Sequence, residues 1–352
     1  MVAAIRYRTT GAFYGVYIWD EGWYATIVDH GYLFDGNNGL LHNVPFFPLY
    51  PLLCKALKML LPALHTSLAM LVISNIFAYL TIRLLFVLSK EMFNFRIAVF
   101  TVLLFLSLPF SFFIFLGFTE SLFFTLVLTF FYFYSVKNER FLPLILIALA
   151  SLTRLYGILL FVVYLVDLFY QKDRGLFRKE LFLAPIATLG ISLFCIYHHY
   201  TFGHPYLFIA NQIAWGHQST IGLLNLLKFK EIAIKALQFD MTNPQSIAAI
   251  YFVSSLFLSI TIYKTLPRSF FSYYIVILSF LFYILSPVAN SIGRYMLCLF
   301  PVIITVPLVL LKNPKEERFE LSDVRFVIFC FFLFTINLNL LQLCFERVHF
   351  VG

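Results

Sequence analysis

Long apolar stretches separated by short polar connections make up most of this chain. A run of about twenty apolar residues is long enough for a helix to cross the hydrocarbon core of a bilayer. Runs of this kind predict membrane helices at 67–88, 97–117, 118–136, 181–200, 246–266, 270–287, 293–311 and 324–343. The run at 142–170 is too long for one upright helix and is interrupted by SLTRLYG, so we expect two short arms of a helical hairpin that meet at Arg154. The pattern predicts an all-α polytopic membrane protein of about ten membrane segments.

Composition supports this interpretation and excludes a soluble enzyme. Of the 352 residues, 61% are hydrophobic and 12% are charged. The net charge of +8 comes from basic residues that stand between the predicted spans, where they usually set topology, so we expect no nucleic-acid partner. Residues 1–18 lack a long apolar core, so we expect no cleavable signal peptide. The five cysteines are scattered without metal-ligand spacing and are interpreted as packing residues.

Charge also assigns a side to each connection. The positive-inside rule makes the basic connections cytoplasmic: Lys90 with Arg96, Lys137 with Arg140, Gln171–Lys179, Lys264 with Arg268, and Lys312–Arg325. The other connections then face outward: residues 1–66, FTES at 118–121, Arg154, the loop at about 200–245, SPVANSIGR at 286–294, and the C-terminus. Nearly every polar residue that topology does not explain lies in this outer set. We therefore expect the active site at the outer face of the membrane.

The expected organisation is a single integral membrane domain over residues 1–352. It comprises a first outer loop at 1–66 and a membrane bundle at 67–343. Three prolines between residues 45 and 51 prevent a continuous helix before the first span. The apolar run at 49–64 then carries two lysines on one helical face, which favours a helix in the outer interface. A short buried span is the alternative.

The stretch YIWDEGWYATIVDHGYLFDG, residues 17–36, carries four carboxylates in a chain with few charges. Asp20 and Glu21 are adjacent, in a predicted loop flanked by two tryptophans and a tyrosine, residues typical of the headgroup level. A carboxylate at that depth can deprotonate a hydroxyl while a lipid-borne partner stays in the bilayer. The alternative is a solvated acidic loop with interfacial aromatic residues.

Glu120 and Arg154 lie within apolar surroundings, where a charge costs at least about 2.5 kcal/mol and usually marks a functional site or a buried pair. Glu120 begins a predicted helix, so favourable interaction with the helix N-terminus is one explanation of it. Arg154 offers bidentate donors that suit a phosphate or a carboxylate such as Glu120. A purely structural Arg154–Glu120 pair is the main alternative.

His198, His199 and Arg294 are further candidates at the outer ends of predicted spans. No acid or cysteine near the histidines completes a zinc site, so we expect no metal there and favour contact with an anionic headgroup. Arg294 could also meet a phosphate, although arginines that anchor a helix to lipid are common at such places. The sequence predicts no cofactor and leaves a role for a divalent ion open.

The candidate residues together suit a lipid-phosphate donor. Arginines and histidines would hold the phosphate, which is the leaving group, while an acid activates the incoming hydroxyl. The chain has no Walker loop and no G-x-G-x-x-G motif, so no nucleotide site is predicted.

Six motifs in order resemble the PIG-V family of mannosyltransferases, which includes the second mannosyltransferase of glycosylphosphatidylinositol anchor synthesis and microbial relatives. The motifs are WDEGWYATIVDHGY, NVPFFPLYPLL, GFTESLFFTL, ASLTRLYGILL, YHHYTFGHPYLFIANQIAW and SIGRYMLCLFP, from about Trp19 to Pro301. The resemblance implies a GT-C membrane glycosyltransferase that takes a sugar from a polyprenyl-phosphate donor with inversion.

By position, the resemblance makes Asp20 the catalytic base, with Glu21 assisting. It also places Glu120, Arg154, His198 and Arg294 around the same cavity. Family members usually have a membrane span before the Trp-Asp motif, whereas here only eighteen residues precede Trp19. The short chain is closer to the microbial members, so a glycosylphosphatidylinositol acceptor is not assumed.

The expected function is transfer of a hexose, with mannose first, from a polyprenyl-phosphate donor to a lipid-linked or cell-surface glycan acceptor. The site would face the extracytoplasmic side of the cell membrane in a prokaryote, or the lumen of the endoplasmic reticulum in a eukaryote. Membrane lipids are the other expected partners. The alternatives are an enzyme of the same fold that uses glucose or a pentose, a membrane transporter, and a noncatalytic scaffold.

Overall fold

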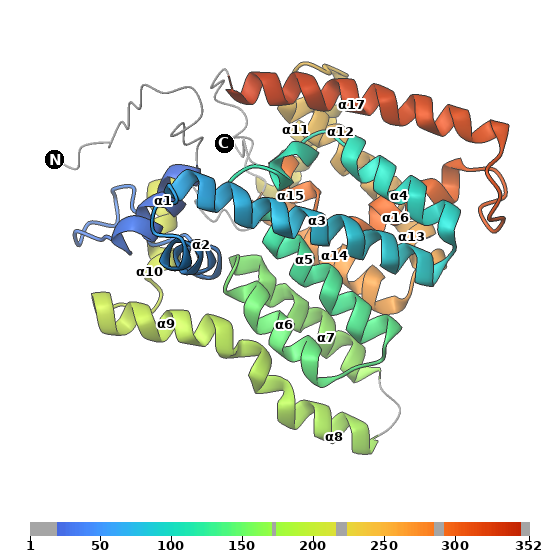
Figure 1. The fold of residues 1–352 in the computed structure, drawn as a ribbon. Helices are drawn as coiled ribbons and strands as arrows, with labels where there is room; N and C mark the ends of the chain where they lie inside the picture. Colours follow the sequence, from blue (N-terminus) through green and yellow to red (C-terminus); the bar gives the residue numbers. More distant parts are fainter. Residues whose placement is uncertain (1–19, 171–173, 216–223, 285–291, 346–352) are drawn as a thin grey trace.

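The computed structural model describes residues 20–170, 174–215, 224–284 and 292–345. These residues form helices and no β-strand (Figure 1). The α-helices are α1 Asp20–His30, α2 Leu49–Leu60, α3 Thr66–Met92, α4 Phe95–Ser107, α5 Glu120–Phe131, α6 Phe141–Ser151, α7 Leu159–Phe169, α8 Arg174–Leu183, α9 Leu189–Phe202, α10 Leu207–Ala210, α11 Leu224–Leu237, α12 Pro244–Phe257, α13 Ser259–Thr265, α14 Arg268–Ile284, α15 Ile292–Met296, α16 Phe300–Leu310 and α17 Val324–Phe345.

Three helical stretches in the described residues are long and apolar enough to cross a membrane: Thr66–Met92, Arg174–Phe202 and Leu321–Cys344. A fourth is possible if α12 and α13, which are bent by 50° at their junction, form one span. The other predicted spans correspond to shorter apolar helices. The all-helical architecture is confirmed, whereas ten spans stay a prediction.

The break expected at Arg154 is present. Helix α6 ends at Ser151, and α7 starts at Leu159 after the short 3₁₀ helix η3, Leu155–Ile158. Arg154 has extended backbone (φ −153°, ψ 145°), which separates the two arms. The single helix predicted at 97–117 is wrong in its second half, because α4 ends at Ser107. Leu108 there is extended, the conformation favoured before a proline such as Pro109.

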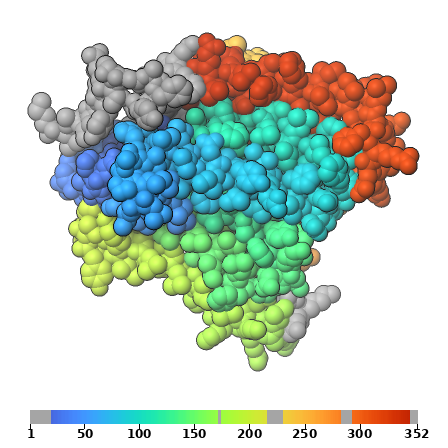
Figure 2. Space-filling model, viewed as in Figure 1, coloured from blue at the N-terminus to red at the C-terminus, as the bar shows by residue number. Residues whose placement is uncertain are grey.

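Helix α5 lies at the centre of the bundle. Eleven of its twelve residues are buried, and after its first turn it is apolar except for Thr125 and Thr129, as is typical of a helix surrounded by others. Helices α3 and α6 pack against it. Helix α17 lies along the outside of α4, while α8 and α9 form the opposite edge (Figures 1 and 2). Most exposed side chains of α17 are apolar, including Ile328, Phe331 and Phe332, which is typical of a surface that contacts lipid or another chain.

The N-terminal region contains more helix than its sequence predicts. Asp20 and Glu21, expected in a loop, are the first two residues of α1, where the helix dipole favours acidic side chains. Helix α2 exposes Leu52, Met59 and Leu60. Its place in a membrane interface stays a prediction.

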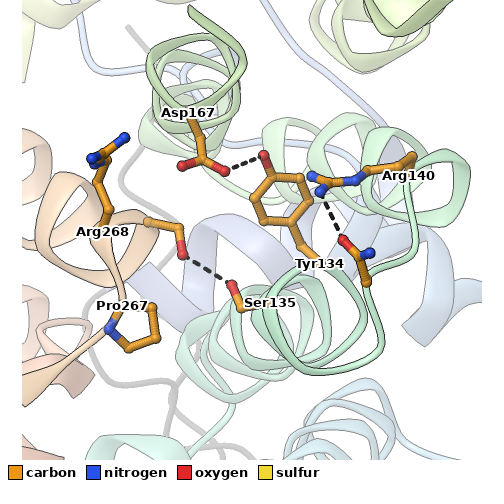
Figure 3. Close-up of a pocket in the computed structure, with 8 residues that line it drawn as sticks. Tyr134, Ser135, Arg140, Asp167, Pro267 and Arg268 are labelled. Atoms are coloured by element: carbon orange, nitrogen blue, oxygen red, sulfur yellow. Dashed lines mark hydrogen bonds between the residues drawn. The ribbon is translucent and has the colours of Figure 1, made fainter. Parts of the chain in front are cut away.

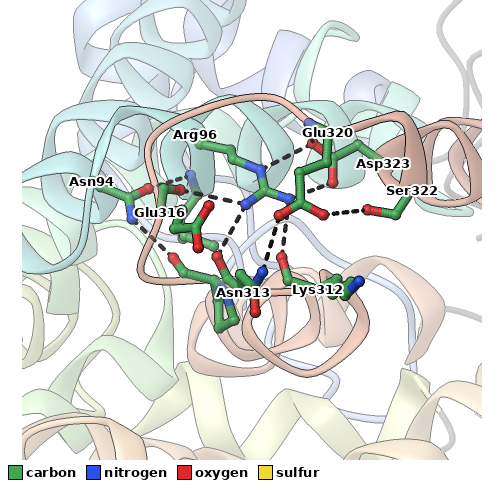
Figure 4. A network of polar contacts seen from close by, with 10 residues as sticks. Asn94, Arg96, Lys312, Asn313, Glu316, Glu320, Ser322 and Asp323 are labelled. Atoms are coloured by element: carbon green, nitrogen blue, oxygen red, sulfur yellow. Dashed lines mark hydrogen bonds and ion pairs between the residues drawn. The ribbon is translucent and has the colours of Figure 1, made fainter.

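A buried polar network ties α4 to the connection before α17 (Figure 4). Arg96 is fully buried and pairs with Asp323, with its Nε 2.9 Å from the carboxylate Oδ2. The guanidinium also donates to the carbonyl oxygens of Lys312 at 3.1 Å and Asn313 at 3.0 Å. Asn94, the N-cap of α4, donates to the carbonyl of Pro314 at 2.9 Å. The cytoplasmic side predicted for the connection of Arg96 stays a prediction, and the structure adds this structural role to it.

Candidate functional site

Four of the seven candidate residues meet at the end of the bundle where α1, α5, η3 and α15 come together. Arg294 forms an ion pair with Asp20, and Arg154 forms one with Glu120. The Nε of Arg294 also lies 3.6 Å from Oε1 of Glu120. The four side chains therefore form a continuous row of alternating charge, which we call the acid–arginine cluster.

Exposure differs sharply within the acid–arginine cluster. The side chains of Glu120, Arg154 and Arg294 are 3%, 9% and 4% exposed, whereas that of Asp20 is 21% exposed. Asp20 is therefore the carboxylate of the cluster that an incoming molecule reaches first. The two arginines need the buried carboxylate, because a buried charge without a partner is strongly destabilising.

Arg154 is fixed by several contacts besides its ion pair. Its Nε donates to the hydroxyl of Thr119 at 2.7 Å, and its Nη1 donates to the hydroxyl of Tyr156 at 2.6 Å. Its guanidinium lies 5.3 Å from the centre of the Tyr295 ring. Thr119 makes no capping bond to α5, so the structure uses this residue to orient Arg154.

Arg294 is held by aromatic rings. Its guanidinium lies 5.7, 5.4 and 5.3 Å from the ring centres of Phe113, Phe118 and Tyr295. Its Nε and Nη1 atoms are buried and make no hydrogen bond within the described part of the chain. Nε still belongs to the ion pair with Glu120, so Nη1 is the donor that an anion entering beside Asp20 would meet.

Glu21 points elsewhere. It is buried, and its Oε1 accepts a hydrogen bond of 2.7 Å from the backbone N–H of Gly117. A Cβ atom at Gly117 would lie 2.9 Å from that same oxygen, so the contact depends on the glycine. In this structure Glu21 joins α1 to the segment before α5 and positions Asp20, its neighbour in sequence.

The two histidines are not brought to the acid–arginine cluster. His198 is fully buried among aromatic rings, with the Phe194 and Phe208 ring centres at 4.3 and 5.7 Å, and neither ring nitrogen has a hydrogen-bond partner in the described residues. His199 is exposed beside Tyr200. No group of three or more His, Cys, Asp or Glu side chains that could hold a metal occurs in the described residues.

Of the tyrosines that line this site, sequence reasoning missed Tyr156 and Tyr295 and placed Tyr24 only at the headgroup level. Tyr156 and Tyr295 contact the two arginines, and Tyr24 of α1 is buried close to Arg154. Burial raises the pKa of Tyr24 above its ordinary value, so its hydroxyl keeps its proton. The sequence does contain a signal for Tyr156 and Tyr295, because each follows its arginine, Arg154 or Arg294, within two positions.

Comparison with protein-family models, with curated proteins and with solved structures gives no match to this chain. The resemblance to the PIG-V family therefore stays a prediction.

Proposed function

We propose that this protein is a membrane glycosyltransferase. It moves a hexose, with mannose the first candidate, from a polyprenyl-phosphate donor to a lipid-linked or cell-surface glycan acceptor, with inversion. The acid–arginine cluster carries the proposal, since it joins one accessible carboxylate to two buried arginines. The outward orientation of this end, taken from the charges of the connections, belongs to the proposal as well.

The roles follow from exposure and contacts. Asp20 takes the proton from the acceptor hydroxyl as that oxygen attacks the anomeric carbon. The bond between that carbon and the phosphate oxygen breaks, and the departing phosphate is held by the Nη1 donor of Arg294. Attack opposite the phosphate inverts the anomeric centre and requires one base. Glu120 keeps both arginines in place and does not touch the substrate.

Entry of the donor changes the ion pairs of the free protein. Arg294 is shared between Asp20 and Glu120 before substrate binds. A phosphate beside Arg294 draws part of that interaction away from Asp20. The Asp20 carboxylate is then less engaged by Arg294 and can accept the proton of the acceptor hydroxyl.

The test measures transfer of radiolabelled mannose from synthetic polyprenyl-phosphate mannose to membrane lipids and protein. Wild type is compared at equal expression with Asp20→Asn, which we expect to lose at least about 100-fold in rate. Asp35→Asn is the matched control, because Asp35 belongs to the same outer region but its side chain is 40% exposed and bound to His42. This control should transfer at the rate of wild type.

Other outcomes separate the parts of the proposal. Full activity of Asp20→Asn would show that Asp20 is not the catalytic base. Transfer from polyprenyl-phosphate glucose or a pentose donor, but not from the mannose donor, would reject mannose and keep the reaction class. Failure of every such donor with correctly folded wild type would reject the function.

A further inference from the structure

A second polar site lies at the other end of α5 from the acid–arginine cluster. It is a pocket of ≈ 210 Å³ between the π-helix η2 (Tyr132–Val136), the end of α7 and the start of α14 (Figure 3). Glu120 and Ser135 are 15 residues apart along one nearly continuous helix, which corresponds to about 22 Å at 1.5 Å per residue. The pocket is therefore separate from the candidate active site.

Hydrogen-bond donors dominate one wall of the pocket. Arg268 lines it, with its guanidinium 4.1 Å from the centre of the Tyr170 ring, and no carboxylate of the described residues lies within ion-pair distance of it. The hydroxyls of Ser135 and Ser269 face each other at 2.9 Å. Arg268 and Ser269 also begin α14, where free backbone N–H groups and the helix dipole favour an anion.

The facing wall carries charges of both signs, from Asp167 and Arg140. Asp167 accepts a hydrogen bond of 2.7 Å from the hydroxyl of Tyr134. Arg140 lies 4.7 Å from the centre of the Tyr134 ring and pairs with Glu180, with 3.4 Å between the charged atoms. Arg140 is thus ion-paired, whereas Arg268 has no ion-pair partner within the described residues, and the two arginines of the lining outnumber its one carboxylate, that of Asp167. Figure 3 shows Arg268 across the cavity from Arg140.

The size and the rim identify the kind of ligand. The volume is below the roughly 300–1,000 Å³ typical of sites for drug-sized molecules, so it suits a group the size of a phosphate ester. Phe169 and Tyr170, beside the pocket, are 76% and 62% exposed, as are aromatic residues at membrane surfaces. Basic connections at 137–140 and 264–268 flank it, and such basic pockets between helices bind acidic lipid headgroups.

We propose that this pocket binds the phosphate of an anionic phospholipid at the membrane surface that the loop charges assign to the cytoplasm. Arg268 forms the ion pair with the phosphate, and the hydroxyls of Ser135 and Ser269 donate to its oxygens. The exposed aromatic rings of Phe169 and Tyr170 contact the glycerol and upper acyl chain. The site does not depend on the transfer reaction, so it stands or falls separately from the proposed function.

Lipid binding to the full-length protein in detergent provides the test, with bound lipid counted by native mass spectrometry. The probes are phosphatidylglycerol, phosphatidylcholine and inorganic phosphate. We expect phosphatidylglycerol to bind tightest, and Arg268→Gln to weaken it at least about tenfold because a charge-assisted hydrogen bond is lost. Lys264→Gln removes an equally exposed cation at the same end that does not line the pocket, and it should bind as wild type does.

The double variant Ser135→Ala with Ser269→Ala keeps the pocket charge and removes its hydroxyls, so weaker binding by this variant supports the site even if Arg268→Gln misfolds. An equal loss of phosphatidylglycerol binding in Lys264→Gln would show that overall charge attracts the lipid, and would overturn the assignment of the binding site to this pocket. Inorganic phosphate binding as tightly as the lipid would overturn the headgroup assignment. Unchanged binding by both pocket variants would overturn the proposal altogether.

Discussion

At the scale of single residues, buried charges are the most informative feature of this chain. The sequence marks Glu120 and Arg154 as unusual, because each stands among apolar residues. It cannot decide between a functional role and a structural pair, since both need the same residue types. The structure contains the pair and adds Arg294 to it, which makes the ion pairing and the proposed phosphate binding parts of one arrangement.

Replacing either member of the Arg154–Glu120 pair tests this arrangement. Arg154→Met leaves Glu120 without its nearest cation, and a broken buried pair costs about 3–5 kcal/mol. Arg154→Met combined with Glu120→Gln removes both charges and should recover much of that loss in thermal unfolding in detergent. Transfer activity should stay lost in the double variant, since the charge of Glu120 that is proposed to keep Arg294 in place is absent. A double variant as unstable as the single one would contradict the pairing.

At the scale of elements, the sequence contains local signals for some helix breaks but not for others. The break at Arg154 could be predicted because SLTRLYG interrupts an apolar run that is too long for one span. The 50° bend between α12 and α13 could not, because the sequence at 257–259 contains no proline or glycine. The sequence also does not show which helices pack closely. In the structure α9 approaches α6 closely at Gly190.

Gly190→Ala tests how closely those two helices pack. A Cβ atom there would lie 1.9 Å from the carbonyl oxygen of Ala148 in α6, so the helices would have to separate. Overpacking of this kind costs about 1–3 kcal/mol, and we expect a lower thermal midpoint in detergent. Leu193→Ala is the control, because Leu193 on the same helix is 57% exposed and should change the midpoint little. Equal midpoints for wild type and Gly190→Ala would show that the helices are farther apart.

At the scale of the whole molecule, sequence predicts the class of fold better than the use of its charges. The all-helical architecture follows from apolar run lengths. Four of seven candidate residues meet in one cluster, but His198 and His199 do not join them, because helix α9 turns one into an aromatic core and the other outward. Arg96 fits a topological pattern in sequence, and only the three-dimensional structure reveals its distant partner.

Arg96→Met should destabilise the whole bundle. It removes the partner of Asp323 and the donors to two carbonyl groups, at a cost of about 3–5 kcal/mol for the broken pair. Thermal unfolding and protease cleavage within 312–323 measure the effect. Lys90→Met removes an exposed cation of the same predicted side and should leave both readouts unchanged. If Arg96→Met and Lys90→Met gave the same thermal unfolding and the same protease cleavage, the Arg96–Asp323 pair would not stabilise the bundle.

The pairing of Arg96 with Asp323 also has a consequence for how the protein is made. The two residues are 227 positions apart, and ribosomes add about 5–20 residues per second. Arg96 therefore waits roughly 10–45 seconds after its own synthesis before Asp323 leaves the peptidyl-transferase centre. During that interval α4 carries at its start a cation without its later partner, and a charge of this kind is costly to place inside a bilayer. This part of the bundle can therefore be completed only late in synthesis. Asp323, in the last quarter of the chain, must be made before it can pair with Arg96, in the first third.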